Sequence, residues 1–293
     1  MPDLSVVIVT WNSARYISQC LDAVLPQAAG AELFVIDNHS TDQTPEILAQ
    51  YGTRVRVILN RSNRGFASAA NQGMAVARGQ YLLLLNPDAV LRPGALDSMT
   101  AFMDAHPETG ALGPQLLNPD SSIQPSCREF PGPIHCLYEF TGLSALFPRH
   151  RRFGSWRMGY FDHASLREVD QPMGACLMIS RAALGKVGRL DQQNFPMFFN
   201  DVDWCYRARQ AGFKIYFYPE ARALHYKGVS IKKARLAMTV ASHQSLARFL
   251  LKHHAKSITT YPAIVLIALA LPVRLVFQSF TIAARIVLGH EQD

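Results

Sequence analysis

Three absences limit what this sequence can do. Its five cysteines form no CxxC pair, so neither a zinc knuckle nor a disulfide framework is indicated. No basic stretch precedes the first apolar run, and that run, 4–9, is too short for a signal peptide. Neither a GxGxxG nor a Walker signature is present, which argues against dinucleotide-binding and phosphate-loop kinase folds. We therefore expect a protein of a reducing, cytoplasmic compartment.

Acidic residues are missing from one long part of the chain. Between Glu220 and Glu291 there is no Asp or Glu, whereas residues 1–220 contain both charges in nearly equal number. The formal net charge of +7 is therefore concentrated in the C-terminal part. A basic segment beside an apolar one indicates an anionic membrane surface as partner. We expect no nucleic-acid partner.

What is present is the pattern of an α/β protein, at 49% hydrophobic and 17% charged residues. Short β-rich runs alternate with helix-like segments, which predicts a mostly parallel sheet. The predicted strands are 4–9, 33–36, 55–59, 81–85, 175–179 and 214–218, and the predicted helices include 67–78 and 202–211. Residues 118–170, which contain the basic run Arg149–Arg152, predict no regular element and are either a substrate loop or a poorly ordered excursion.

The C-terminal part changes character after residue 230. Residues 234–254 are predicted to be helical, and 258–288 are strongly apolar. The uncharged stretch 257–273 is short for a membrane span, which needs about 20 residues. Beyond this stretch, four polar residues share one helical face, which favours a helix lying in the membrane interface with its arginines reaching lipid phosphates. They are Arg274, Gln278, Thr281 and Arg285. The alternative is an apolar helix packed on the protein's own core.

Polar clusters follow four consecutive predicted strands. They begin at Thr10, Asp37, Asn60 and Asn86. In an open parallel sheet, ligands bind at the carboxyl ends of the strands. Each cluster alone is compatible with an ordinary turn, but four in succession indicate a binding site at this edge of the sheet.

Three later residues are candidates for chemistry. Asp88 can hold a divalent ion that bridges phosphates, or belong to a simple Asn-Pro-Asp turn. Asp201, at a predicted helix start, can take a proton from a hydroxyl or merely cap the helix. His225, after a strand ending at 219–221, can complete a metal site or be structural. Asp203 and Arg207 are spaced as an i, i+4 ion pair.

The order of these motifs resembles glycosyltransferase family 2, the inverting enzymes of GT-A fold, over about residues 4–230. The matching motifs are V-V-I-V-T-W-N at 6–12, V-I-D-N-H-S-T-D at 35–42, N-R-G-F-A-S-A-A-N-Q-G at 63–73, L-N-P-D-A at 85–89, G-A-C-L-M at 174–178 and N-D-V-D-W-C-Y-R at 200–207. The N-x-G-F-A and N-P-D-A forms are similar to those of the bacterial rhamnosyltransferase-like subgroup, which commonly uses dTDP-rhamnose to build O-antigen, capsule or cell-wall linker.

The resemblance implies a GT-A domain at 1–230, and the basic and apolar composition after it predicts a helical membrane-associating tail at 231–293. It implies Asp201 as general base, and Asp88 with His225 as ligands of Mg²⁺ or Mn²⁺. The donor-binding residues that it implies are Thr10, Trp11, Asn12, Asp37, Asn38, Asn63, Gly65, Asn71 and Asn86. The sequence departs from the family pattern in having a single carboxylate at 86–88, and Asn200 in place of the usual Glu before Asp201.

The function that the resemblance implies is transfer of a sugar, with inversion, from a nucleotide diphosphate donor to a hydroxyl of a lipid-linked saccharide. The enzyme would work at the cytoplasmic face of the bacterial inner membrane, as a peripheral or monotopic protein. dTDP-rhamnose is the favoured donor, and another UDP- or GDP-sugar is the alternative. Two rival functions are a sugar-1-phosphate nucleotidyltransferase, whose Gly-rich basic signature is missing here, and a membrane-tethered module with an inactive site.

Overall fold

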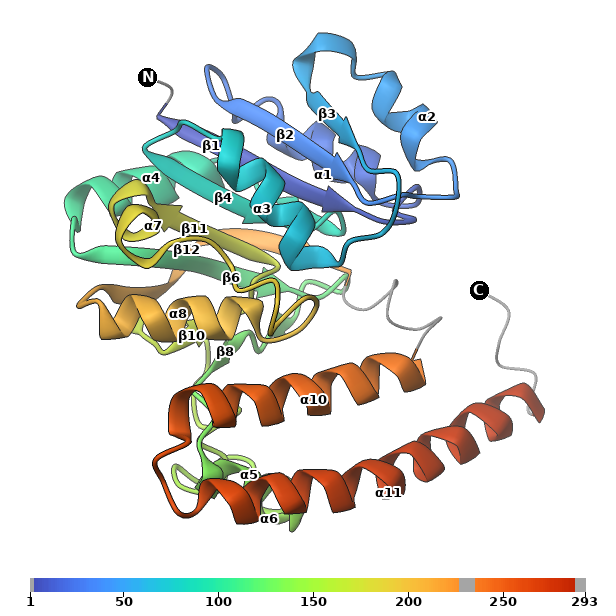
Figure 1. The fold of residues 1–293 in the computed structure, drawn as a ribbon. Helices are drawn as coiled ribbons and strands as arrows, with labels where there is room; N and C mark the ends of the chain where they lie inside the picture. The colour runs from blue at the N-terminus through green and yellow to red at the C-terminus, as the bar shows by residue number, and fades with distance from the viewer. Residues whose placement is uncertain (1–2, 227–234, 288–293) are drawn as a thin grey trace.

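The computed structural model describes residues 3–226 and 235–287, and its core is one twisted sheet covered by helices on both faces (Figure 1). The main strand order is β3-β2-β1-β4-β11-β6-β12-β5. These strands are β1 (Leu4–Thr10), β2 (Glu32–Asp37), β3 (Arg56–Leu59), β4 (Tyr81–Leu85), β5 (Ala89–Leu91), β6 (Thr109–Leu117), β11 (Cys176–Ser180) and β12 (Lys214–His225). Strands β3, β2, β1 and β4 pair in parallel, as do β6 and β12, whereas β11 and β5 run antiparallel to their neighbours. The expected α/β class with a mostly parallel sheet is confirmed.

Helices cover each face because one side of each is apolar. α1 (Ile17–Val24) buries four residues at i, i+3, i+4 and i+7, and lies with α2 (Thr44–Ala49) and α4 (Ala95–Ala105) against one face of the sheet. α3 (Phe66–Val76), α7 (Arg181–Val187) and α8 (Asn200–Gln210) cover the other face. α3 approaches β1 so closely that a Cβ on Gly73 would lie 2.5 Å from a methyl carbon of Val7.

The six predicted strands and the helices at 67–78 and 202–211 are all present. The first residue of each lies within a few positions of the predicted one. One prediction is wrong in extent: β12 does not end near Pro219 but continues to His225. Its register to β6 shifts between Tyr218 and Arg222. Proline has no N–H to donate to a ladder, so the strand bulges there and then resumes.

Regular elements also occur between residues 118 and 172, where none was predicted. They are β7 (Ile123–Gln124), β8 (Cys127–Arg128), α5 (Pro133–Phe140), α6 (Leu143–Leu146), β9 (Arg167–Glu168) and β10 (Gln171–Pro172). The four strands have two residues each, too few for an alternating pattern to be seen in a sequence.

α10 (Arg235–His254) and α11 (Thr260–Val287) form an antiparallel pair below α8, and α5 packs on α11 (Figure 1). Their shared core contains Cys136 of α5, Leu246 and Leu250 of α10, and Ala263 and Ile267 of α11. These helices therefore form a layer of their own, which we call the helical layer.

The polar stripe of α11 faces this layer. Arg274 lies 3.3 Å from Glu139 of α5 and stacks over the ring of Phe140, and Thr239 of α10 donates to Gln278. The expectation that Arg274 reaches lipid phosphates is therefore wrong, because a carboxylate of the protein pairs with it first. The side chain of Arg285 lies outside the described residues.

The opposite face of α11 is apolar and exposed. Within the 22 residues Thr260–Thr281, the most apolar window of 18 residues has a mean hydropathy of 2.1, so by length and composition this helix can cross a membrane. Only 11% of its most apolar window is buried. The large apolar side chains on its exposed face are Tyr261, Val265, Leu269, Val273, Val276, Phe277 and Phe280.

Candidate active site

The first two strand ends are joined by side-chain hydrogen bonds. Thr10 and Asp37 are paired residues of β1 and β2, and the hydroxyl of Thr10 donates to the Asp37 carboxylate at 2.9 Å. The backbone N–H of Ser40 donates to the same carboxylate at 3.0 Å. Asp37 thus caps the turn after β2 through its side chain, the ordinary structural role of an aspartate at this position. A direct role in nucleoside binding remains a prediction.

Asn12 and Trp11 continue the site beyond β1. Asn12 is exposed, has a φ of 50°, and its side-chain oxygen accepts from the N–H of Thr41 at 2.8 Å. Asparagine is one of the few residues that tolerate this left-handed conformation. Trp11 is half-buried beside it. The loops after β1 and β2 are therefore linked into a single rim.

Amide side chains link the second strand end to the third. Asn38 is buried and donates to Asn63 at 2.8 Å, while its oxygen accepts from the N–H of Arg64 at 3.0 Å. Gly65 follows with a φ of 77°, and a Cβ there would lie 3.0 Å from the carbonyl oxygen of Pro196. Only glycine fits this conformation and this close approach, so the loop leading into α3 is held in one shape.

Asn71 of α3 is used by the protein itself. Its side chain donates to the carbonyl of Leu190 at 2.9 Å and to Gln192 at 3.0 Å, and its oxygen accepts from the N–H of Leu190 at 3.0 Å. These bonds fix the loop between α7 and α8 against the predicted donor site. The structure thus shows a positioning role for Asn71, and its contact with the donor remains a prediction.

Asp88 and His225, far apart in the sequence, lie together at the next part of the edge. His225 Nε2 is 3.5 Å from Asp88 Oδ1, and both side chains are mostly buried. The N–H of Tyr226 donates to the carbonyl of Asp88 at 3.0 Å, which holds the end of β12 against the loop after β4. Asn86 lies at the start of that loop, where its N–H donates to Ala175 at 2.8 Å.

Gln124 of β7 orients the imidazole of His225. Its Nε2 donates to the carbonyl of His225 at 3.2 Å and to Asn118 at 2.8 Å, which leaves its Oε1 to accept from His225 Nδ1 at 2.8 Å. With the proton on Nδ1, the lone pair of a neutral imidazole is on Nε2 and faces the Asp88 carboxylate. Two such groups repel each other unless Nε2 is protonated or a cation joins them, so this donor set fits a divalent ion.

The protein can supply two metal ligands at this place. Among residues 3–226 and 235–287, no three His, Cys, Asp or Glu side chains gather closely enough to hold a metal ion. Mg²⁺ is often bound by one or two carboxylates together with oxygens of a substrate's phosphates, so two protein ligands are sufficient for a site completed by a nucleotide diphosphate.

Asp201 begins α8 beside the same edge. Its Oδ2 accepts from the N–H of Gly174 at 2.9 Å and from Gln171 at 2.8 Å, and its Oδ1 accepts from the N–H of Val202. Gly174 precedes Ala175, whose carbonyl binds the N–H of Asn86, so Asp201 and Asp88 belong to one continuous hydrogen-bonded edge. Burial raises the pKa of Asp201 above its ordinary value, although these hydrogen bonds oppose the shift. A carboxylate with a raised pKa is a stronger base.

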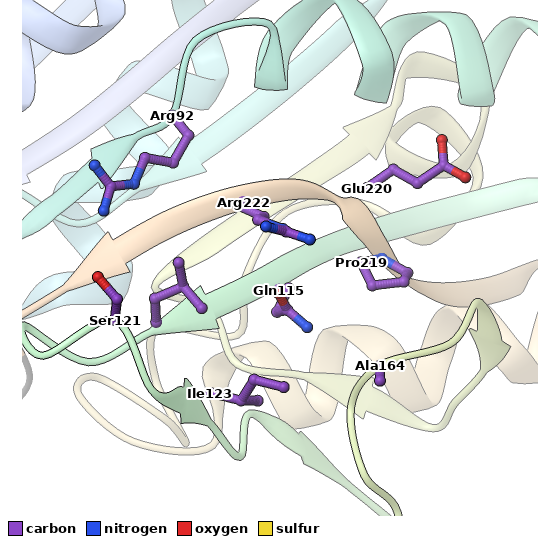
Figure 2. A pocket seen from close by; sticks show the side chains of 9 residues that line it. Arg92, Gln115, Ser121, Ile123, Ala164, Pro219, Glu220 and Arg222 are labelled. Carbon is purple, nitrogen blue, oxygen red and sulfur yellow. The ribbon is translucent and has the colours of Figure 1, made fainter.

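A cavity of about 680 Å³ is formed between β6, β12 and the segment before α4 (Figure 2). Figure 2 shows Arg222 and Pro219 on β12, Gln115 on β6, and Arg92 above them at the entrance to α4. Ile123, on the opposite wall, precedes the Gln124 that orients His225. None of the predicted site residues is among the described residues that line the cavity.

Asp203, two residues further along α8, connects this site to α10. Its carboxylate is completely buried and accepts from Arg207 at 2.8 Å, from Lys252 at 2.6 Å and from His253 at 2.8 Å. The predicted Asp203–Arg207 pair is confirmed. Lys252 also binds Asp191 in the loop before α8, at 2.8 Å. Two cationic side chains and an imidazole thus converge on one carboxylate two residues from Asp201.

Sequence reasoning missed the side chains that position the predicted site. Gln124, Gln171, Lys252 and His253 follow no motif, and each binds a residue at least 30 positions away. The one available signal was the basic end of the segment 234–254, which was interpreted only as a membrane-facing charge.

Comparisons with known proteins agree with this geometry. The model of the family described as "Glycosyl transferase family 2" matches residues 5–162. The chain is 30% identical over 268 residues to the N-acetylglucosaminyl-diphospho-decaprenol L-rhamnosyltransferase of Mycobacterium tuberculosis, covering 86% of this chain and 85% of that protein. It is 25% identical over 223 residues to a low-salt glycan biosynthesis hexosyltransferase of Haloferax volcanii, covering 73% of this chain and 64% of that protein.

Solved structures are similar in fold. A mannosyltransferase from Pyrobaculum calidifontis in complex with GDP-Man and Mn²⁺ superposes with a TM-score of 0.59 at 18% identity, over 99% of this chain and 79% of the other. TarS 1–349 of S. aureus gives a TM-score of 0.55 at 18% identity, over 93% and 82%. The fold is thus of the GT-A type, and the chain belongs to glycosyl transferase family 2 and is a glycosyltransferase.

Proposed function

We propose that the protein transfers L-rhamnose from dTDP-rhamnose to a hydroxyl of a lipid-linked saccharide, in the synthesis of a bacterial cell-surface polysaccharide. The observation that supports this proposal is that three side chains lie along one hydrogen-bonded edge of a GT-A sheet: Asp201, the proposed base, and Asp88 and His225, the proposed metal ligands. The choice of sugar and acceptor is supported by the similarity to a rhamnosyltransferase named for a diphospho-decaprenol acceptor.

The mechanism follows from the positions of these groups. Asp201 takes the proton of the acceptor hydroxyl, the oxygen attacks the anomeric carbon, and the bond from that carbon to the diphosphate breaks, so the configuration inverts. Asp88 and His225 would hold Mg²⁺ or Mn²⁺, which neutralises charge on the diphosphate. The loops that contain Asn12, Asn38 and Asn63 would hold the nucleoside and the ribose.

The cavity in Figure 2 is our candidate for the acceptor-binding region. Arg92 and Arg222 line it, and guanidinium groups suit the phosphates of a lipid-linked saccharide. Glu220, the acidic side chain of its lining, already accepts from the hydroxyl of Tyr218 at 2.9 Å.

A donor screen tests the function directly. Purified protein is incubated with dTDP-rhamnose, UDP-sugars or GDP-sugars, together with a polyprenyl-diphosphate-linked saccharide. We expect release of nucleoside diphosphate, highest with dTDP-rhamnose, and a lengthened glycan by mass spectrometry. Release of pyrophosphate from a nucleoside triphosphate would indicate a nucleotidyltransferase instead, and no release with any donor would indicate an inactive binding module.

Gln124→Met tests the metal site without touching a ligand. The change keeps Asp88 and His225 but removes the acceptor that orients the imidazole. Losing such a partner typically weakens metal affinity by about 10- to 100-fold, so activation by Mn²⁺ should require correspondingly more metal.

Asp88→Ala should abolish Mn²⁺-dependent binding of the nucleoside diphosphate in calorimetry. If Asp88→Ala binds metal and nucleotide as the wild type does, Asp88 is not a ligand.

Membrane attachment is the remaining part of the proposal. α11 keeps its polar face on α5 and α10 and exposes an apolar face along its length, which suits a helix lying in the inner leaflet as a peripheral or monotopic element. Apolar burial of this face stabilises attachment by about 25 cal/mol per Å².

Truncation after His254 tests this attachment. The shortened chain keeps Lys252 and His253, and therefore the bonds of Asp203 to α10. We expect a soluble protein that still binds or hydrolyses the donor but loses activity on the lipid-linked acceptor. A matched variant with Leu269→Ser and Phe277→Ser, both on the exposed face, should leave membrane pellets without unfolding. Full-length protein that stays in the supernatant with membranes at low salt would contradict the proposal.

A further inference from the structure

A second surface of the helical layer combines apolar and basic side chains. Leu146 is 69% exposed and Phe147 is 45% exposed, and they end α6 immediately before the exposed run Arg149-His150-Arg151-Arg152. Residues 140–161 contain four arginines and no acidic residue. The nearest acid in the sequence on one side, Glu139, is already paired with Arg157 and Arg274. We call residues 146–152 the basic loop.

The basic loop has a defined shape. The N–H of Gly154 donates to the carbonyl of His150 at 2.8 Å, and the N–H of Arg152 donates to His150 Nδ1 at 3.2 Å. The carbonyl oxygen of Pro148 lies so close to Gly154 and Gly159 that a Cβ on either would be 2.0 or 2.1 Å from it. Glycine at both positions is therefore required for the turn to close.

The basic loop is anchored to α5, the helix that packs on α11. Arg152 donates to the hydroxyl of Tyr138 in α5 at 2.8 Å, and the ring of Phe153 packs against Tyr138 edge to face at 5.1 Å. α5 in turn binds Arg274 of α11 through Glu139. Figure 1 shows α6 and the first half of α11 together at the side of the molecule away from the sheet. The basic loop is thus continuous with the layer that contains the exposed apolar face of α11.

We propose that the basic loop is a second membrane-contacting element, in which Leu146 and Phe147 enter the lipid interface and Arg149 and Arg151 bind anionic lipid phosphates. Within the described residues neither arginine pairs with a carboxylate, and the guanidinium of Arg151 lies 5.7 Å from the centroid of the Tyr160 ring. An exposed apolar pair beside cations without a carboxylate partner is the composition of segments that lie on anionic membranes. Each cation near an anionic surface strengthens attachment to it. The loop therefore adds a preference for anionic lipid that the apolar face of α11 does not have. This inference rests on the proposed attachment of α11, and the test separates the two.

Vesicle sedimentation tests the charge of the loop. Full-length protein is mixed with vesicles of phosphatidylcholine alone or with phosphatidylglycerol added. Arg149→Gln with Arg151→Gln should weaken binding to the anionic vesicles by roughly 30-fold and leave binding to phosphatidylcholine unchanged. Arg54→Gln with Arg78→Gln removes the same charge from exposed positions of the sheet domain, and should change binding far less. Equal losses in the two double variants would overturn the proposal, because they would show an effect of net charge alone.

A fluorescent label tests insertion of the loop. All five native cysteines are buried, so a cysteine introduced at Phe147 can be labelled selectively. An environment-sensitive dye at this position should shift to the blue on anionic vesicles, whereas the same dye at the exposed Ala75 of α3 should not. A dye at residue 147 that remains in water while the protein sediments with vesicles would overturn the proposal and leave α11 as the attachment. The double variant Leu269→Ser with Phe277→Ser keeps the basic loop intact and tests α11 separately. Loss of its sedimentation with vesicles would show that α11 is needed for attachment.

Discussion

Asp201→Asn should lower the rate of sugar transfer at least about 100-fold while the protein stays folded and binds its donor. The substitution keeps the shape of the side chain and one oxygen for the N–H of Gly174, but removes the proton acceptor. A general base contributes about 10²- to 10⁴-fold to such a reaction. The measurement is kcat with the lipid-linked acceptor, beside donor affinity by calorimetry.

The control for this variant is Asp97→Asn, the same change at an exposed position in the first turn of α4, which should be silent. The pH profile gives an independent check. Because burial raises the pKa of Asp201, kcat should fall on the acid side at a pH above the usual range of an aspartate, about 3.9, and this acid limb should be absent in the variant. Transfer by Asp201→Asn above about a tenth of the wild-type rate would mean that another group is the base.

Asp203→Asn should destabilise the protein by about 3–5 kcal/mol, the usual cost of removing one partner from a buried ion pair. The variant leaves Lys252, His253 and Arg207 facing a neutral side chain in a completely buried position. For a chain of this size, the melting temperature should fall by roughly 10 °C. Lys252→Met leaves Arg207 and His253 in place as hydrogen-bond donors to Asp203 and should cost less. Equal melting temperatures for Asp203→Asn and the wild type would show that this cluster does not hold α10 on α8.

The same cluster predicts a dependence of stability on pH. Burial opposes the charges of Asp203 and Asp191, but hydrogen bonds from Lys252 and other donors outweigh it and lower both pKa values, that of Asp191 to about 2. Both carboxyls thus bind protons less readily in the folded state, so their contribution is present above the unfolded pKa of about 3.9 and is lost as the pH falls toward 2. Unfolding by denaturant at pH 6, 4 and 3 should show this loss in the wild type and a smaller one in Lys252→Met.

The sheet and the edge of the site were predictable because their signals are local. Each of the first four strands is an apolar run followed directly by a polar turn, and this pattern correctly placed Thr10, Asp37 and Asp88 at strand ends. The pairing of Asp88 with His225 joins residues 137 positions apart, and it was expected only from the family resemblance.

The parts that the sequence did not reveal depend on distant partners. Gln124 looks like any polar residue of an irregular stretch until β7 places it against His225, 101 positions away. The polar stripe of α11 has the spacing of a helix in contact with phosphates, and a single buried carboxylate, Glu139, reverses the direction in which Arg274 points. The boundary at residue 230 and the roles of the donor-binding residues remain predictions.

The contacts of the Asp203 carboxylate also limit where this chain can be joined to another family member in a chimeric protein. A chimera joined near residue 230 would place foreign helices opposite Asp203 and would leave its charge without Lys252 and His253. A junction placed after His254 keeps Lys252 and His253 opposite Asp203 and exchanges only α11. The proposed membrane attachment can then be altered without disturbing the first turn of α8, which contains Asp201. Modules of this enzyme are therefore best exchanged at the hairpin between its last two helices, although composition alone would place the seam some 25 residues earlier.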